Sequence, residues 1–210
     1  MASSARPGVE QLLAAARTGG EAELGRLLEL YRNYLHLLAR TQIDLHLQGR
    51  ASASDLVQET FLDACRDFEQ FRGGTEPELL AWLRRILVFN LARMVQQQVG
   101  TKKRDIRREV SLHQYARRLD RSSAHFEAAL LGRHSSPSEQ AQRRERAALV
   151  ADQLARLPKQ YREILVLRNL EGLPFADVAQ RMGRSEGAVR VLWVRALDRF
   201  RQLLEKEDLP

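Results

Sequence analysis

The sequence has a single cysteine, Cys65, and lacks any long apolar run. One cysteine excludes an intrachain disulfide framework and a cysteine-based zinc site. No segment approaches the length of a membrane span, and the opening MASSARPGVE lacks the apolar stretch of a signal peptide. We therefore expect a cytoplasmic protein without membrane insertion.

Motifs for catalysis are missing as well. The five histidines are scattered without metal-ligand spacing, and no glycine-rich phosphate loop is present. Neither paired carboxylates nor a Ser/His/Asp arrangement offers an active site. We expect no catalytic residue, no bound metal and no cofactor, which leaves a nucleic-acid-processing enzyme without a reactive constellation.

What the sequence does contain is an excess of basic residues. Lysine and arginine number 34 against 27 aspartates and glutamates, which gives a formal net charge of +7. Such a balance favours a polyanionic partner, nucleic acid before an anionic membrane, although an ordinary basic protein has it too. The hydrophobic content of 44% is sufficient for packed cores.

Apolar residues recur at helical steps along most of the chain, and no segment alternates as a strand does. Residues 21–46 and 78–98 each predict a helix, and Ser52 followed by Asp55 predicts a capped start for another helix between them. We expect this middle helix to have one apolar and one mostly polar face. The apolar face would hold Val57, Phe61, Ala64, Cys65 and Phe68, and the polar face Asp55, Gln58, Glu59, Asp63 and Arg66.

The predicted fold class is therefore all-α, with two small helical domains joined by a basic linker. The linker prediction rests on a segment rich in lysine and arginine that has no sustained apolar face. The expected divisions are a flexible N-terminus at 1–20, a first domain at 21–98, the basic linker at 99–136 and a second domain at 137–206.

The most specific pattern is FADVAQRMGRSEGAVRVLWVRAL at residues 175–197. Small Ala179 permits a close helix crossing, and Gly183 supplies the positive φ of a tight turn. Val189 and Leu192, one helical turn apart, fix the second helix to the core. The spacing predicts a helix-turn-helix. A packing αα-hairpin has the same spacing, but the basic charge of the chain favours DNA binding.

In that motif the face of the second helix opposite its core residues would enter a major groove, where Arg190 reaches guanine or phosphate. Ser185 is a good N-cap for the helix. The run Val191-Leu192-Trp193-Val194 is apolar, so the sequence does not indicate which bases are recognised. The candidate DNA-binding residues are Arg184, Ser185, Glu186, Arg190, Val191, Val194 and Arg195.

Two segments together resemble a known family. Residues 154–204, LARLPKQYREILVLRNLEGLPFADVAQRMGRSEGAVRVLWVRALDRFRQLL, resemble σ4, the promoter-reading domain of bacterial sigma factors. Residues 53–97, ASDLVQETFLDACRDFEQFRGGTEPELLAWLRRILVFNLARMVQQ, resemble their σ2 domain. Two such domains joined by a linker are typical of the extracytoplasmic-function (ECF) group in the sigma-70 family.

The resemblance implies a promoter-specificity subunit of RNA polymerase with no catalytic activity of its own. Its σ4 domain would recognise the minus-thirty-five element and contact the β flap. Its σ2 domain would dock on the β′ clamp helices and hold the melted minus-ten element, with the loop at residues 71–76 around a flipped base. An anti-sigma factor is a possible further partner.

The same resemblance assigns residues to these σ2 roles. Core polymerase binding falls to Asp55, Gln58, Glu59 and Asp63. Promoter melting and single-strand binding fall to Arg72, Trp82, Arg84, Arg85, Asn90 and Arg93, although a packing role for Trp82 is an equal alternative. The main rival function is a helix-turn-helix transcriptional regulator that binds duplex DNA without being a polymerase subunit.

Overall fold

The computed structural model describes residues 8–46, 52–99 and 148–206, and the regular elements within these ranges are all helices. The chain divides into two compact units, Met1–Leu119 and Asp120–Pro210, which we call the N-terminal and C-terminal units. The predicted all-α fold in two helical domains is confirmed. The predicted basic linker, 99–136, lies outside the described residues except for Val99.

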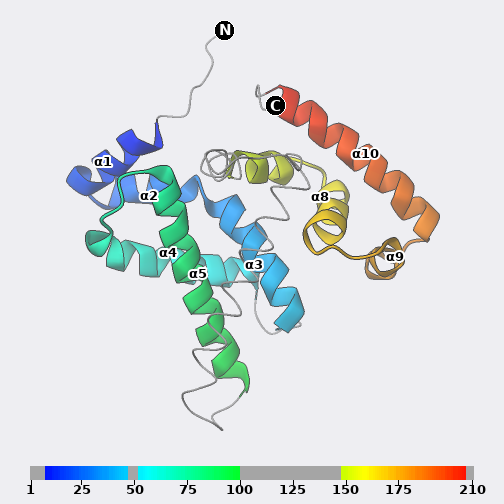
Figure 1. Cartoon of the computed structure of the whole chain (residues 1–210), viewed down its shortest axis with the longest axis horizontal. Coiled ribbons are helices and arrows are strands. Elements are labelled where there is room, and N and C mark those ends of the chain that lie inside the picture. Colours follow the sequence, from blue (N-terminus) through cyan, green and yellow to red (C-terminus); the bar gives the residue numbers. More distant parts are fainter. Residues whose placement is uncertain (1–7, 47–51, 100–147, 207–210) are drawn as a thin grey trace, which may run out of the picture. The chain divides into compact units, whose positions relative to one another are not determined.

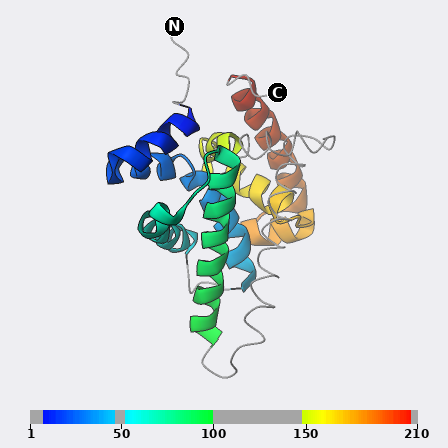
Figure 2. The ribbon, with the colours of Figure 1, turned by 60° about the vertical axis from the view of Figure 1, so that its left-hand side comes forward.

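Five α-helices and one short 3-10 helix form the described part of the N-terminal unit (Figure 1). In both views α5 runs across α3 and α4 (Figures 1 and 2), and each of these helices packs against the other two. Fully buried leucines from several helices form the core. The elements are α1 (Val9–Gly19), α2 (Glu21–Glu29), α3 (Arg32–His46), α4 (Ala53–Asp67), η1 (Phe68–Gln70) and α5 (Glu76–Val99).

The N-terminus differs from the flexible segment expected at 1–20, because Val9–Gly19 form α1. Leu13 and Ala16 lie one turn apart on this helix and are buried, at 2% and 6% exposure, where α1 packs on α2. Gly20, with φ of 95°, ends α1 and lets the chain turn sharply into α2. Residues 9–19 showed only a weak helical periodicity of apolar side chains in the sequence, and packing against α2 stabilises the helix that they form.

The single helix expected over residues 21–46 is two helices, since α2 ends at Glu29, α3 begins at Arg32 and a turn lies between them. Tyr31, at this break, is 1% exposed, and its hydroxyl donates a hydrogen bond of 2.9 Å to Glu76 Oε1 at the start of α5. No glycine or proline marks the break, so periodicity did not reveal it.

The start of α4 agrees with the sequence, and its faces agree except at Cys65 and Asp63. The Ser52 hydroxyl accepts a hydrogen bond of 3.0 Å from the Asp55 backbone N–H, as the capping pattern predicts. Cys65, expected in the core, is exposed, while Asp63, expected on the polar face, is only 7% exposed. The buried stripe is turned toward Leu56 and Thr60, and the Thr60 hydroxyl is satisfied by the Leu56 carbonyl at 2.7 Å.

In the C-terminal unit, residues 148–155 are helical and three further helical segments lead to the long α10. Gly183 adopts the left-handed conformation, with φ of 62°, in the turn between α9 and α10, as predicted. The Ser185 hydroxyl accepts a hydrogen bond of 3.3 Å from the Ala188 N–H. The elements are α8 (Lys159–Leu165), the π-helix η2 (Val166–Leu170), α9 (Phe175–Met182) and α10 (Glu186–Glu205).

Replacing Ser185 with alanine is expected to destabilise the C-terminal unit by about 1 kcal/mol, because the N-cap bond of α10 is lost. The two tryptophans of the chain, Trp82 and Trp193, lie in different units. Urea unfolding followed by Trp193 fluorescence in a Trp82→Phe background therefore reports on this unit alone. Ser52→Ala, which removes the matching cap of α4, should leave the Trp193 midpoint unchanged. An equal effect of both changes would contradict the assignment.

Candidate nucleic-acid interface and interhelical cleft

The outer face of α10 carries the predicted DNA-binding residues. Val189, Leu192 and Ala196 are buried, at 0%, 7% and 0% exposure, and fix the opposite face to the core. Val191 and Val194, one turn apart on α10, are 53% and 50% exposed. The structure exposes all of the predicted set: Arg184, Ser185, Glu186, Arg190, Val191, Val194 and Arg195.

Arg190 is held in place by two local partners. Its guanidinium pairs with the Glu186 carboxylate one turn earlier on α10 and lies 4.5 Å from the centre of the Phe175 ring. The Arg168 guanidinium lies 4.7 Å from the same ring, so Phe175 contacts two cations. Trp193 packs edge-on against Phe175, with ring centres 5.6 Å apart.

Trp193 is in turn fixed by a hydrogen bond of 3.0 Å from its indole N–H to Asn169 Oδ1 in η2. Sequence reasoning missed Phe175 and Asn169 as residues that support α10. Asn169 and Trp193 are 24 residues apart in the sequence, so local periodicity does not reveal their contact.

Arg184 links the turn between α9 and α10 to α8 through a hydrogen bond of 3.0 Å to Gln160 Oε1. Arg195 has no ion-pair partner among the described residues.

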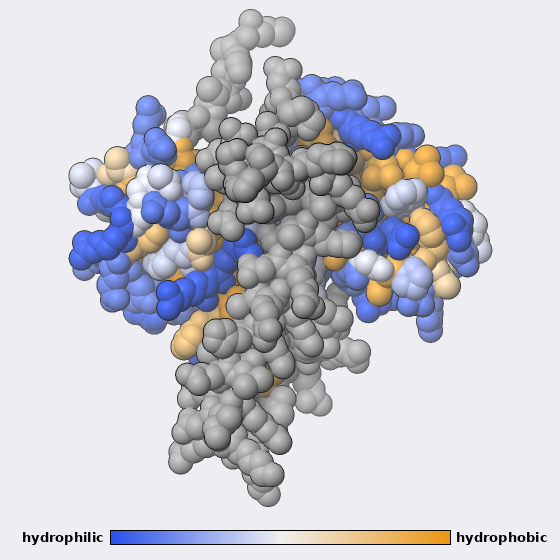
Figure 3. Space-filling view, in the orientation of Figure 1, coloured by the Kyte–Doolittle hydropathy of each residue, from blue (hydrophilic) through white to orange (hydrophobic). Residues whose placement is uncertain are grey.

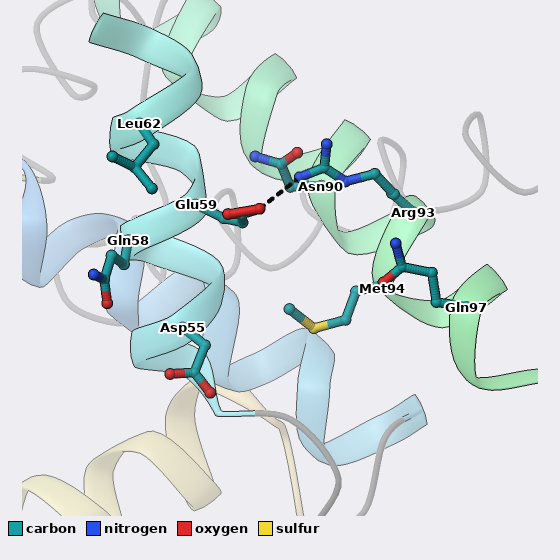
Figure 4. Close-up of a pocket in the computed structure, with 8 residues that line it drawn as sticks. All are labelled: Asp55, Gln58, Glu59, Leu62, Asn90, Arg93, Met94 and Gln97. Atoms are coloured by element: carbon teal, nitrogen blue, oxygen red, sulfur yellow. Dashed lines mark hydrogen bonds and ion pairs between the residues drawn. The ribbon is translucent and has the colours of Figure 1, made fainter.

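A cleft of about 550 Å³ lies between α4 and α5. Glu59 extends from α4 toward Arg93 on α5, and the ion pair between them measures 3.0 Å (Figure 4). Arg93 also lies 3.9 Å from Asp63, which pairs with Arg66 at 2.8 Å. The lining residues are Asp55, Gln58, Glu59, Leu62, Asn90, Arg93, Met94 and Gln97.

This geometry corrects the expected exposure of Asn90 and Asp63 and gives Arg93 a partner, while the binding roles of all three residues stay predictions. Asn90 is 1% exposed and lines the cleft, so it does not present its amide on the outer surface of α5. Arg93 is engaged with Glu59 on α4. Asp63 is buried beneath Arg66 and Arg93 instead of lying on the polar face. Burial of the Asn90 position follows from its place beside Leu87 and Leu91 on the core side of the helix.

The Asn90 amide is also unpaired, since neither its oxygen nor its nitrogen has a hydrogen-bond partner among the described residues. A buried polar group left in this state costs about 1–3 kcal/mol. The Asn90 amide is therefore an unsatisfied group buried in the wall of the cleft that Asp55 and Glu59 also line.

The predicted strand-binding loop between η1 and α5 is built around Glu78 and Gly73. The Glu78 carboxylate accepts hydrogen bonds of 2.8 Å and 3.1 Å from the Gly74 and Thr75 backbone N–H groups and one of 2.9 Å from the Thr75 hydroxyl. A Cβ at Gly73 would lie 2.5 Å from Phe71 Cζ, so only glycine fits there. The Arg17 guanidinium of α1 donates to the Gly73 carbonyl, which ties the loop to the N-terminal helix.

The aromatic residues of this region pack together. The Trp82 ring stacks on Phe71, with ring centres 4.8 Å apart, and lies 6.2 Å from the Phe68 ring. The packing alternative for Trp82 therefore has direct support. Arg72 and Arg85 are exposed, and Arg84 is half-buried.

The hydrogen bonds to Glu78, chiefly those from Gly74 and Thr75, hold the pKa of its carboxyl below the ordinary value. A carboxyl with a depressed folded-state pKa stabilises above its unfolded pKa, and this contribution is lost as pH falls through the folded value. We expect Glu78→Gln to lower the Trp82-monitored unfolding midpoint at neutral pH, with the difference from the parent vanishing in acid. Glu69→Gln, an exposed control, should show no such pH-dependent difference, and a constant gap for Glu78→Gln would contradict the assignment.

The described residues give no support for a metal site or a membrane-spanning helix. Within residues 8–46, 52–99 and 148–206, no group of three or more His, Cys, Asp or Glu side chains is placed to hold a metal ion. None of the described helices has the length and hydropathy needed to cross a membrane. The described surface visible in Figure 3 is mostly hydrophilic, with separate hydrophobic patches.

Comparison with known proteins identifies the family. The Sigma-70 region 2 family matches residues 27–100, and the Sigma-70, region 4 family matches residues 147–200. The chain is 30% identical over 196 residues to the ECF RNA polymerase sigma factor SigM of Mycobacterium tuberculosis, covering 92% of this chain and 83% of SigM. It is 27% identical over 205 residues to the ECF RNA polymerase sigma-E factor of Haemophilus influenzae, covering 96% and 95%.

The ECF RNA polymerase sigma factor BldN of Streptomyces coelicolor is 29% identical over 194 residues, and the match spans 92% of this chain but 65% of BldN. A chain in the solved RsbN–BldN complex is 27% identical, covering 94% of this chain and all of that chain, with a TM-score of 0.30. The chain belongs to the ECF sigma factors of the sigma-70 family, the class of non-catalytic initiation factors that direct RNA polymerase to promoters.

Proposed function

We propose that the N-terminal unit binds core RNA polymerase and the melted minus-ten element, while the C-terminal unit binds the duplex minus-thirty-five element. The observation that carries this proposal is the construction of α10. Its N-terminus is capped by Ser185, its inner face is fixed by Val189 and Leu192, and its outer face is exposed. A helix held in this way enters a major groove without rearrangement.

On α10 the contacts fall into two chemical kinds. Arg190, beside Glu186 and Phe175, is oriented to donate to a guanine edge or a phosphate. The exposed Val191 and Val194 side chains suit the methyl group of thymine. Arg184, Ser185 and Arg195 lie along the same exposed surface, where phosphate contacts would set the register. The remaining surface of the C-terminal unit would contact the β flap.

On α4 the polymerase-binding face consists of Asp55 and Gln58, both exposed, together with the cleft behind them. Carboxylates on this face suit a basic partner surface, here the β′ clamp helices. Glu59 would stabilise this face through the ion pair that joins α4 to α5. Asp63, which is buried, would orient Arg66 through their ion pair.

The loop at residues 71–76 and the first turns of α5 would hold the opened minus-ten strand. Arg72 and Arg85 offer exposed positive charge for its phosphates, and Arg84 lies beside them. Trp82, stacked on Phe71, supports the loop from within. The polymerase would supply the catalysis, and a cytoplasmic location for this chain follows from the proposal that it acts with that enzyme.

An anti-sigma factor is the remaining predicted partner. Support comes from the relative BldN, which was solved in a complex with RsbN. A test is whether a protein encoded beside this chain co-purifies with it and prevents its binding to core polymerase. Co-purification without any effect on core binding would count against this role.

The proposal as a whole is tested by mixing tagged chain with core RNA polymerase, measuring co-purification and then transcription from genomic fragments. We expect a stable complex that initiates at defined sites where core enzyme alone does not. A regulator of the helix-turn-helix type would instead bind duplex DNA tightly without core enzyme and leave the start sites of core enzyme unchanged. That outcome would overturn the proposal.

A further inference from the structure

Asn169 contacts α10 from outside the helix-turn-helix, and it has no assigned role in base recognition. It lies on η2, which Val166 and Leu167 fix in the core of the C-terminal unit, at 0% and 2% exposure. The wide turn of this π-helix is closed where the Glu171 N–H donates a hydrogen bond of 2.9 Å to the Val166 carbonyl. Single π-helical turns are frequent at functional sites.

Asn169 and its neighbour Arg168 both contact the helix-turn-helix. Asn169 Oδ1 accepts the hydrogen bond of 3.0 Å from the Trp193 indole N–H on α10. Arg168 lies 4.7 Å from the centre of the Phe175 ring and donates a hydrogen bond of 2.9 Å to the Leu173 carbonyl, just before α9. The η2 segment therefore holds one aromatic ring of each helix of the motif, Phe175 on α9 and Trp193 on α10.

The two rings contact each other, and one of them contacts Arg190. Their centres are 5.6 Å apart and the rings lie at 78° to each other, so the position of Trp193 limits where Phe175 can lie. The centre of the Phe175 ring is in turn 4.5 Å from the Arg190 guanidinium. A displaced Trp193 would leave room for Phe175 to turn away from Arg190. The contacts thus run continuously from Asn169 through Trp193 and Phe175 to Arg190.

Arg190 depends on the Phe175 ring because its other contact is weak. The ion pair with Glu186 joins side chains that are 58% and 46% exposed and one helical turn apart, and such exposed pairs contribute little. Glu186 holds the guanidinium along α10, whereas Phe175 contacts it from α9. A guanidinium donates both of its bonds to a guanine only when it is placed within about 0.5 Å, so the loss of one of two constraints lowers base discrimination.

We propose that Asn169 is a positioning residue for base recognition, because its hydrogen bond to Trp193 keeps Phe175 against Arg190. This inference rests on the proposed function and adds to it a specificity-determining residue that acts through other side chains. Asn169→Leu should lower the discrimination between guanine and a substituted base about 2- to 10-fold, the scale of one side-chain hydrogen bond. Asn169→Asp, which keeps an acceptor for the indole N–H, should retain the discrimination.

The test measures the affinity of holoenzyme for a labelled duplex from a promoter that it uses, and for the same duplex with one guanine replaced by adenine. The guanine is the one whose preference Arg190→Ala removes, and the ratio of the two affinities is the discrimination. We expect Asn169→Leu to lose part of this ratio in the parent background. In the Arg190→Ala background it should lose none, since its effect passes through Arg190.

A spectroscopic measurement separates positioning from loss of the fold. In a Trp82→Phe background the chain has one indole N–H, whose NMR resonance should shift in Asn169→Leu while the unit stays folded. Trp193→Phe keeps a ring but has no N–H donor, and it should reproduce the loss of discrimination even if Asn169→Leu does not fold. The matched control is Gln202→Leu, which removes an exposed bond of 3.1 Å to Arg199 and should discriminate like the parent.

Parent-like discrimination by folded Asn169→Leu, or by Trp193→Phe, would overturn the inference. Additive losses in the double variant with Arg190→Ala would also overturn it, since Asn169 would then act independently of Arg190. An equal loss with Asn169→Asp would do the same, because the acceptor would not matter. Absence of any base preference that depends on Arg190 is a different result, and it would contradict the proposed function of α10 itself.

Discussion

Asp55→Lys combined with Gln58→Lys is expected to weaken binding to core RNA polymerase by more than about 100-fold, since opposing like charges at an interface costs several kcal/mol. Both side chains are exposed on α4 and line the cleft, but neither forms the bridge to α5. The change therefore reverses the charge of the proposed docking face while the Glu59–Arg93 ion pair stays intact. Binding is measured by titrating core enzyme into labelled chain.

The matched control is Glu69→Lys combined with Gln70→Lys, which adds the same charge on the exposed η1 segment. This variant should bind core enzyme like the parent. Salt dependence gives a second reading, because exposed charge contacts are screened as ionic strength rises. Parent-like binding by the Asp55 and Gln58 variant would show that α4 is not the docking face.

The second large effect is expected at Arg190. Arg190→Ala removes a contact worth about 1–3 kcal/mol if the guanidinium recognises a guanine, so initiation from a dependent promoter should fall about 5- to 150-fold. The loss should disappear on a template whose minus-thirty-five base at that position has been changed. Core binding, which is proposed for α4 and for the remaining surface of the C-terminal unit and not for this face of α10, should remain that of the parent.

Arg199→Ala is the control for Arg190→Ala, because Arg199 is exposed farther along α10 and bonds only to Gln202 among the described residues. Holoenzyme that carries Arg199→Ala should transcribe normally.

Phe175→Leu should reproduce part of the Arg190→Ala defect, since it removes a cation–π contact worth about 0.5–1 kcal/mol at an exposed site. Strictly additive losses in the double variant would argue against a positioning role for Phe175.

The helix-turn-helix was predicted from sequence in detail because its determinants are local. The φ of Gly183, the cap at Ser185 and the inward turn of Val189 all depend on residues within one or two turns. The outward set on α10 followed directly, since a face opposite a buried stripe is exposed. Periodicity and capping together are enough for such a motif.

The features that could not be predicted from the sequence depend on contacts between segments far apart in the chain. The Glu59–Arg93 pair joins residues 34 apart in the chain, so the sequence did not reveal that Arg93, expected beside a DNA strand, pairs with Glu59 across the cleft. Asn90 and Asp63 look like surface residues in the sequence, but packing of α4 on α5 buries both. The Phe71–Trp82 stack and the ordering of α1 by α2 have the same origin.

The central claim is that one chain brings core polymerase to promoters recognised in two parts, and mapping transcript 5′ ends tests it most directly. Core enzyme with this chain on genomic DNA should start at sites preceded by shared minus-ten and minus-thirty-five sequences at a constant spacing. The same sites should be silent with core enzyme alone and weakened with Arg190→Ala. Starts that share no upstream sequence, or that core enzyme makes equally well by itself, would contradict the claim.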